Sequence, residues 1–243
     1  MRHLHIIMPM AGEGQRFKKE GYDNPKPLIE LEDKPLFLHA IDSVKPDNIE
    51  LKYSLIIRQE HIDTYSLDKE IKKLIPEANV FSVEKTTRGA VETCLMAESA
   101  IDDNDAVIVI DCDLEFSSED FINFINRSLN ESPETARGGA LVSFHSNNPR
   151  YSYALADENG WVIKTAEKEV ISENALCGAY FFASGKKFKQ IAHKLLDEPI
   201  MTKPEFYLSL LYNYLILDHE PVKLTHIDTY RSFGTPEELK QWK

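Results

Sequence analysis

Two cationic side chains lie close to a glycine loop in the first thirty residues of the sequence. Gly12-Glu13-Gly14-Gln15-Arg16 directly follows an apolar run, and Lys26 comes ten residues after Arg16 with a proline on either side. Glycine lets a backbone approach a phosphate or a base closely, while arginine offers a planar fork and lysine a point charge. The grouping predicts a nucleoside triphosphate site. A tight turn with two solvated charges is the alternative that the loop alone leaves open.

A pair of aspartates follows the most apolar run of the sequence. Asp111 and Asp113 come directly after residues 106–110, and strand periodicity puts their side chains on the same side. Carboxylates at the end of a buried strand suit Mg²⁺, which takes oxygen ligands and keeps waters and phosphate oxygens in its remaining positions. We therefore predict a magnesium site with Asp113 as the main ligand. The alternative is a turn or helix-capping role, for which Ser117 is an equally good candidate.

The elements that must position these residues alternate between strands and helices in the first half of the chain. Short apolar, β-branched runs predict buried strands at 4–10, 51–57, 80–83 and 106–110. Helical spacing or helix-forming composition between and after them predicts helices at 62–74, 90–101 and 121–129. This order indicates a doubly wound sheet, in which loops at the carboxyl ends of the strands form the ligand site.

The second half has a different pattern, with more strands in succession. Strands are predicted at 140–144, 151–156, 161–164, 176–182 and 222–227, with a hairpin turn at Asn159-Gly160. Helices are predicted at 186–196, at 205–217 and from Pro236. We therefore expect an α/β fold of three layers (α/β/α) with a mixed, mainly parallel central sheet. Residues 1–243 would form a single domain with two lobes, about 1–137 and 138–243.

Composition excludes several classes of function. The 243 residues carry 28 Lys and Arg against 40 Asp and Glu, a net charge of −12, which disfavours nucleic acid and anionic membranes as partners. Phe17 stands where a dinucleotide fingerprint needs a third glycine. No apolar run reaches the roughly 18 residues of a membrane span, and the first residues lack the anatomy of a signal peptide. We expect a soluble, cytoplasmic protein.

Together these residues resemble the sugar-phosphate nucleotidyltransferases, also called pyrophosphorylases, which have a GT-A-like fold. The family begins with Gly-x-Gly-x-Arg followed by Pro-Lys, which stand here as Gly12 to Arg16 and Pro25-Lys26. The start Met8-Pro9-Met10-Ala11-Gly12 looks closest to a branch associated with capsular polysaccharide biosynthesis. Later segments also resemble motifs of the family and occur in the order that the family has. These segments are Thr87-Arg88-Gly89-Ala90, Asp113, Glu167-Lys168, the run from Ala175 to Phe182, and Asp228 with the run from Phe233 to Leu239.

The resemblance implies a role for each matching residue. The implied catalytic residues on the triphosphate are Arg16 and Lys26, and the implied nucleotide-binding residues are Ala11, Gly12, Glu13, Gly14 and Gly89. The implied acceptor-binding residues are Glu167, Lys168 and Gly178, and the implied Mg²⁺ ligands are Asp113 and Asp228. On this view the first lobe binds the nucleotide and the second the acceptor. Four residues separate Asp228 from Phe233, more than in many relatives.

The resemblance also implies the reaction. A phosphorylated sugar or similar small acceptor attacks the α-phosphorus of a nucleoside triphosphate in a Mg²⁺-dependent step, and pyrophosphate leaves. A pyrimidine nucleotide is favoured, with CTP placed first. The main alternative is a GT-A glycosyltransferase that uses a nucleotide-sugar donor, because Asp111-Cys112-Asp113 is an Asp-x-Asp motif. A non-catalytic nucleotide-binding subunit is a third. The sequence ends soon after the closing helix, so we expect no second catalytic domain, and a homodimer is compatible with the sequence.

Overall fold

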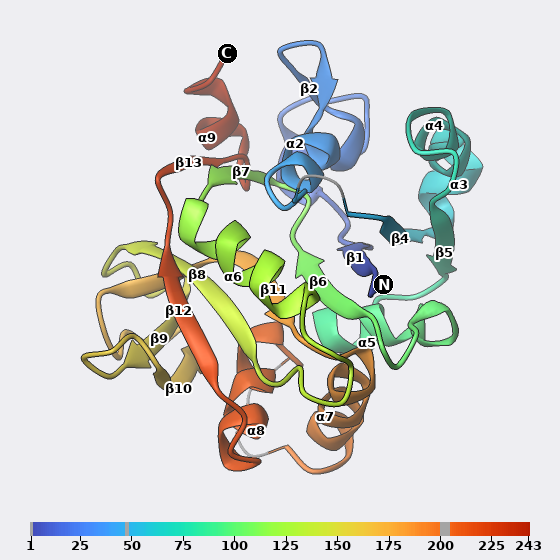
Figure 1. Cartoon of the computed structure of the whole chain (residues 1–243). Coiled ribbons are helices and arrows are strands. Elements are labelled where there is room, and N and C mark those ends of the chain that lie inside the picture. The colour runs from blue at the N-terminus through green and yellow to red at the C-terminus, as the bar shows by residue number, and fades with distance from the viewer. Residues whose placement is uncertain (1, 47–48, 200–204) are drawn as a thin grey trace.

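A computed structural model describes residues 2–46, 49–199 and 205–243 and is built on one nine-stranded mixed sheet (Figure 1). The strand order is β10-β9-β11-β6-β1-β4-β5, with β8 paired to β11 and β12 paired to β8. The bounds are β1 Leu4–Met10, β4 Leu51–Arg58, β5 Asn79–Val83, β6 Ala106–Ile110, β8 Gly139–His145, β9 Ser152–Ala156, β10 Val162–Glu167, β11 Asn174–Phe182 and β12 Val222–His226.

The sheet is parallel in the first half of the chain and mostly antiparallel in the second. β1 pairs in parallel with β4 and β6, and β4 in parallel with β5. β11 pairs antiparallel with β6, β8 and β9, whereas β12 runs parallel to β8. The predicted mixed, mainly parallel α/β sheet is thus confirmed, and the two predicted lobes share it through the β6–β11 pair.

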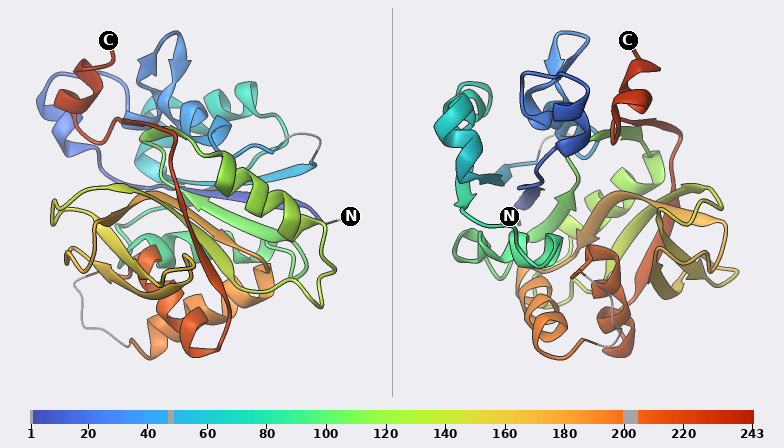
Figure 2. Two further views of the ribbon diagram at one scale, coloured as in Figure 1. Left: turned by 60° about the vertical axis from the view of Figure 1, so that its left-hand side comes forward. Right: turned by 180° about the vertical axis from the view of Figure 1, so that it is seen from behind.

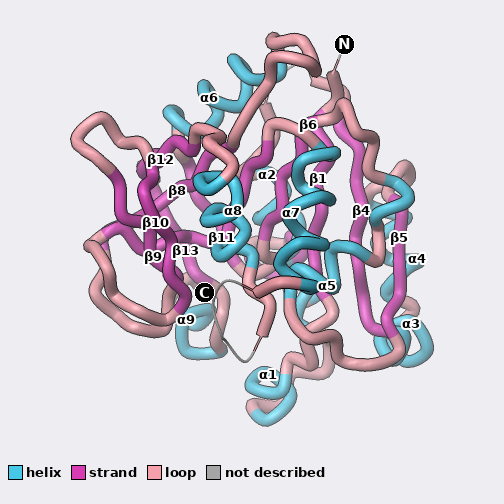
Figure 3. Tube along the Cα trace, turned by 90° about the horizontal axis from the view of Figure 1, so that it is seen from below, coloured by secondary structure: helices cyan, strands magenta, loops and turns pink. Residues whose placement is uncertain are grey.

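Helices cover both faces of the sheet. Their bounds are α1 Gln15–Lys19, α2 Leu36–Asp42, α3 Gln59–Tyr65, α4 Leu67–Leu74, α5 Ala90–Leu95, α6 Glu119–Leu129, α7 Gly185–Asp197, α8 Leu211–Leu217 and α9 Pro236–Lys240. Side chains of α2, α4 and α6 join one buried cluster, and those of α5, α7 and α8 join another. Figure 3 views the sheet from the side of α5, α7 and α8. No helix in the described part of the chain is long and apolar enough to cross a membrane.

The central strands explain why the sequence forms this sandwich. In β6 the residues Ala106, Ile108 and Ile110 face one cluster, and Val107 and Val109 face the other. All five are fully buried. A β-branched run therefore fits a strand that is covered on both faces.

Some predicted helices are shorter or divided. The predicted helix 62–74 is two helices, α3 and α4, because Ser66 between them takes a left-handed backbone with φ +51°. The predicted helix 90–101 ends at Leu95 and resumes as a 3-10 turn at Glu98–Ala100. The predicted helix 205–217 begins as a 3-10 turn at Leu208–Leu210 before α8. Tertiary contacts set these ends more strongly than helix propensity does.

Small elements outside the main sheet complete the carboxyl edge. β7 (Leu114–Ser117) pairs antiparallel with β13 (Thr229–Ser232), and β2 (Glu30–Leu31) pairs with β3 (Lys34–Pro35). The C-terminal helix α9 packs beside the N-terminal region (Figure 2), where Phe233 and Leu239 share a buried cluster with Phe17. The C-terminal helix thus lies beside α1, close to the loop that follows β1.

Candidate active site

The glycine loop, the lysine and the aspartates meet at the carboxyl edge of the sheet. Because β1 and β6 are parallel neighbours, the loop after Met10 and the Asp111–Asp113 segment leave the sheet side by side. Lys26 begins a 3-10 turn (Lys26–Leu28) and its ammonium forms an ion pair with Asp113. Open α/β sheets bind their ligands at this edge. The structure therefore brings the glycine loop and Lys26, predicted for the triphosphate, next to Asp113, predicted for the metal.

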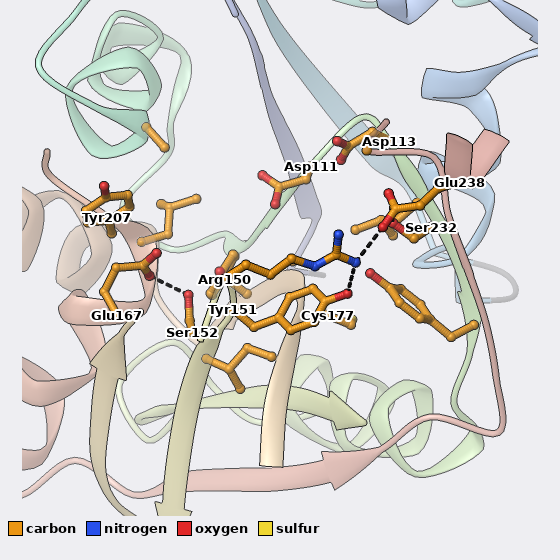
Figure 4. Close-up of a pocket in the computed structure, with 18 of the residues that line it drawn as sticks. Asp111, Asp113, Arg150, Tyr151, Ser152, Glu167, Cys177, Tyr207, Ser232 and Glu238 are labelled. Carbon is orange, nitrogen blue, oxygen red and sulfur yellow. Dashed lines mark hydrogen bonds and ion pairs between the residues drawn. The ribbon is translucent and has the colours of Figure 1, made fainter. Parts of the chain in front are cut away.

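Asp111 lies where three cavities adjoin. The first cavity, of about 320 Å³, opens toward β9, β10 and β11, and Figure 4 shows its walls. The second, of about 340 Å³, is lined by Gly12, Gly14, Lys26 and Asp113. The third, of about 490 Å³, lies between the glycine loop and the segment 86–90. A ligand with several parts could occupy adjoining cavities around one carboxylate.

The charges of Lys26, Asp111 and Asp113 are coupled. Burial alone would lower the pKa of Lys26, but Asp113 and Asp111 reverse this effect and raise it. Burial, reinforced by Asp113, raises the pKa of Asp111 to about 7, and Lys26 opposes the rise. Lys26 therefore stays charged beside two carboxylates that repel each other. An arrangement of this kind accepts a further cation readily and offers Lys26 to an anion.

The third cavity brings Ala11 and Gly12 opposite Gly89. A methyl group on Gly89 would lie 2.5 Å from the backbone nitrogen of Phe206, so glycine is required for this close packing. The contact is fixed by two hydrogen bonds, from Phe206 N–H to Arg88 O at 2.9 Å and from Val91 N–H to Phe206 O at 3.1 Å. Gly89 therefore shapes the cavity wall. Glu13 is exposed and does not line any of the three cavities, and its carboxylate accepts from the Gln15 side chain at 2.9 Å.

Glu167 and Gly178 lie in the first cavity, as the acceptor assignment expects. Glu167 is 5% exposed, and its carboxylate accepts hydrogen bonds from Ser152 Oγ and Ser209 Oγ. Gly178 has φ +99°, and a methyl group there would lie 2.6 Å from Asp111 Oδ2. Its missing side chain thus makes room for the central carboxylate.

Lys168 lies at the edge of this cavity rather than inside it. Its side chain is exposed, and its ammonium donates to the Tyr207 hydroxyl at 2.9 Å. That hydrogen bond, against the opposing effect of partial burial, raises the pKa of Lys168. Arg16 is also exposed and lines the first cavity, and its side chain makes no hydrogen bond or ion pair with the described residues. Its guanidinium is therefore available to a ligand.

The structure does not bring Asp228 to Asp113. Asp228 precedes β13, and its Oδ2 accepts from the backbone N–H of Glu119 at 2.9 Å, at the start of α6. In the β13–β7 pair it is Ser232 that pairs with Leu114, next to Asp113. Ser232 is four positions after Asp228, which corresponds to about 13 Å at the usual rise of a strand. The prediction of a shared metal site for Asp113 and Asp228 therefore does not fit the fold.

Sequence reasoning missed several side chains in the first cavity. Arg150 enters from the loop before β9, and Ser232 and Glu238 enter from the C-terminal segment. The ring of Tyr230 stacks on Phe144, with centroids 4.8 Å apart. The sequence from Gly234 to Glu238 does predict a helix start, and Glu238 stands in the first turn of that helix, α9. No sequence signal relates Arg150 to this site, because its position depends on the path of the loop between β8 and β9.

Asp111 and Asp113 fit a magnesium ion in donor chemistry. No three His, Cys, Asp or Glu side chains in the described ranges converge on one metal position. Mg²⁺ does not need such a cluster, because it commonly binds through one or two carboxylates together with substrate phosphates and waters. Burial first, and the charge of Asp113 second, raise the pKa of Asp111, and a divalent cation bound to the two carboxylates would favour their ionised form. The two aspartates therefore suit this ion together with a phosphorylated ligand.

The fold is α/β, and the carboxyl edge of its sheet carries the glycine loop, Lys26, Asp111 and Asp113. The chain belongs to the nucleotidyl transferase family, whose model matches residues 5–229. This match confirms the family resemblance inferred from the motifs.

Individual relatives are distant but cover nearly the whole chain. Bifunctional protein GlmU of Buchnera aphidicola is 25% identical over 93% of this chain and 46% of its own length, so the chain spans about half of that relative. The nucleoside-diphosphate-sugar pyrophosphorylase of Vibrio cholerae RC9 superposes with TM-score 0.82, at 24% identity and with 98% of each chain covered. The inositol-1-phosphate CTP transferase of T. maritima superposes with TM-score 0.72, at 16% identity over 99% of this chain and 94% of that one. These structures share the fold described above.

Proposed function

We propose that this chain is a nucleotidyltransferase that joins a nucleoside triphosphate to a phosphorylated sugar or similar small acceptor. A phosphate oxygen of the acceptor forms a bond to the α-phosphorus, and the bond to the β-phosphate breaks to release pyrophosphate. The observation that carries the proposal is the meeting of Gly12, Gly14, Lys26 and Asp113 around the second cavity, between one cavity for the nucleoside and another for the acceptor.

The side chains present are sufficient for this chemistry. The nucleophile is already an anion near neutral pH, since the second pKa of a phosphate ester is about 6, so the reaction needs positioning and charge neutralisation rather than a general base. Lys26 would exchange Asp113 for the oxygens of the triphosphate, and Arg16 would meet its phosphates from α1. Mg²⁺, held by Asp113 and Asp111, would supply the positive charge that polarises the α-phosphate.

The nucleotide and the acceptor would contact different walls of the adjoining cavities. Ala11, Gly12 and Gly14 would approach the nucleoside triphosphate with their backbone, opposite Gly89. Glu13 would act only from the outside of the loop. Glu167 would accept from a hydroxyl or amine of the acceptor, Gly178 would leave room for Asp111, and Lys168 would hold the outer rim of the acceptor cavity. Asp228 has no role in this scheme.

The nucleotide that we propose is a pyrimidine, with CTP first. Support comes from the loop sequence, which offers no purine-specific contact, and from the relative named as a CTP transferase. The proposed setting is the biosynthesis of nucleotide-activated cell-surface building blocks in the cytoplasm.

A melting-temperature panel with Mg²⁺ and CTP, UTP, dTTP, GTP or ATP tests the nucleotide. A ligand that binds only the folded protein adds about 2.7 kcal/mol of stability at one hundred times its dissociation constant. We expect CTP to give the largest shift. A shift with nucleotide-sugars and none with triphosphates would favour the glycosyltransferase alternative, and nucleotide binding without pyrophosphate release would favour a non-catalytic subunit.

A further inference from the structure

Arg150 lies within the first cavity and is oriented before any ligand binds. Its side chain is 47% exposed, and its guanidinium carbon is 4.5 Å from the centre of the Tyr151 ring. One terminal nitrogen donates to the Tyr151 hydroxyl and forms an ion pair with Glu238. Figure 4 shows the guanidinium directed toward the end of the cavity that holds Asp113, away from Glu167. Stacking of a planar fork on a ring restricts its orientation, so little further ordering is needed for binding.

Glu238 can release Arg150 without losing its other contacts. Its Oε2 accepts from Ser232 Oγ at 2.9 Å and from the Thr235 backbone N–H at 3.1 Å. The second of these bonds belongs to the capping box at the start of α9. Only Oε1 is directed at Arg150. A ligand oxygen could therefore replace Oε1 while the capping box stays intact.

The charge balance of the first cavity favours Arg150 as its anion ligand. The described residues that line it include four carboxylates and two guanidiniums, those of Arg16 and Arg150. Lys168 is bound to Tyr207, which Figure 4 places at the opposite end from Asp113. Arg16 stands on α1, directly after the glycine loop of the nucleotide side. A phosphate that enters from the acceptor side and approaches Asp113 would meet Arg150.

The guanidinium of Arg150 lies at the end of the first cavity that holds Asp113, where the reaction would take place. A methyl group on Gly234 would lie 3.0 Å from Glu238 Oε2 and 3.5 Å from Asp113 Oδ2, so these two carboxylates flank one small space. We propose that Arg150 binds the phosphate of the acceptor there, and that Glu238 occupies the guanidinium until the acceptor arrives. This inference rests on the proposed function, because the acceptor phosphate must reach the α-phosphorus beside Asp113.

The test is a titration of the full chain with inorganic phosphate, followed by melting temperature, with and without saturating CTP and Mg²⁺. Arg150→Gln removes the proposed ligand. Glu238→Gln removes the competing charge and keeps the capping box, because glutamine also serves at that position. Arg127→Gln is the matched control, since Arg127 is another exposed guanidinium over an aromatic ring, that of Phe124. Each variant is first compared with the wild type without phosphate.

We expect Arg150→Gln to weaken phosphate binding at least about tenfold, the loss expected for one charge-assisted contact. Glu238→Gln should bind phosphate more tightly than the wild type, and Arg127→Gln should bind it equally. Equal affinity in Arg150→Gln, or no phosphate binding by the wild type, overturns the assignment. The CTP titration separates the two proposals. If phosphate binding depends on Arg150 but neither CTP nor any other triphosphate of the panel changes the melting temperature, the proposed function is overturned. The assignment of the anion site then still holds.

Discussion

Replacing Gly89 with alanine should destabilise the fold by about 4 kcal/mol. The added methyl group would lie 2.5 Å from the backbone nitrogen and 2.6 Å from the carbonyl oxygen of Phe206, at a residue with φ +145°. Backbone atoms cannot rotate away as the end of a side chain can, so the two segments must separate and lose the two hydrogen bonds between them. Each bond contributes about 1 kcal/mol net, and an unfavourable backbone conformation costs about 1–3 kcal/mol.

Thermal unfolding measures this cost directly. In a domain of this size each kcal/mol lowers the melting temperature by about 2–4 °C, so we expect a fall of roughly 8–16 °C. A Gly89→Ala protein with the same melting temperature as the wild type would refute the reasoning. The contact between Gly89 and Phe206 would then tolerate a methyl group without loss of stability.

Gly12→Ala is the matched control on the opposite side of the same cavity. None of the described atoms would lie within 4 Å of the added methyl group, so stability should change by less than about 0.5 kcal/mol. The melting shift produced by CTP and Mg²⁺ should nevertheless fall, because the methyl group stands where the backbone would meet the ligand. An unchanged shift would show that Gly12 belongs to a turn and not to the nucleotide site.

Two further predictions concern aspartates. The pKa of Asp111 is raised in the folded protein, from 3.8 to about 7, so its ionisation opposes folding increasingly as pH rises from about 4 to 7. The melting temperature of Asp111→Asn minus that of the wild type should therefore increase as pH rises across that interval. A difference that does not change with pH would contradict the raised pKa of Asp111. Asp228→Ala should lose about 1 kcal/mol of stability in urea unfolding, because its carboxylate accepts from the first turn of α6. Its pyrophosphate release should stay unchanged, and a loss of turnover would restore Asp228 to the metal site.

Much of the fold could be predicted because its strands carry strong local signals. β1 begins and ends where the apolar run does, and β6 has five fully buried apolar residues that serve both faces of the sheet. The turn at Gly160 is marked by its sequence and has φ +75°. The break at Ser66 and the short strands β7 and β13 were not predictable. β7 and β13 form through contacts between segments that lie far apart in the sequence, and a serine does not mark a left-handed backbone as a glycine does.

The site likewise contains residues that local sequence signals predicted and residues that they could not predict. The glycine loop and Asp113 follow predicted strands closely, so the parallel pairing of β1 and β6 brings them together, whereas Lys26 reaches them through the segment after α1. Asp228 and Ser232 are only four residues apart, and the register of β13 against β7 decides which of them lies near Asp113. A short strand pair of this kind has no sequence pattern that fixes its register. Arg150 likewise reaches the cavity through a loop whose path no local signal specifies.

The most direct test of the central claim is pyrophosphate release from CTP with Mg²⁺ and a panel of phosphorylated acceptors. The comparison is between the wild type, Asp113→Asn and Asp228→Asn. We predict acceptor-dependent release by the wild type and by Asp228→Asn, and none by an equally stable Asp113→Asn protein. Release that survives in Asp113→Asn, or is lost in Asp228→Asn instead, would contradict the assignment of the carboxyl edge of β6 as the reacting centre.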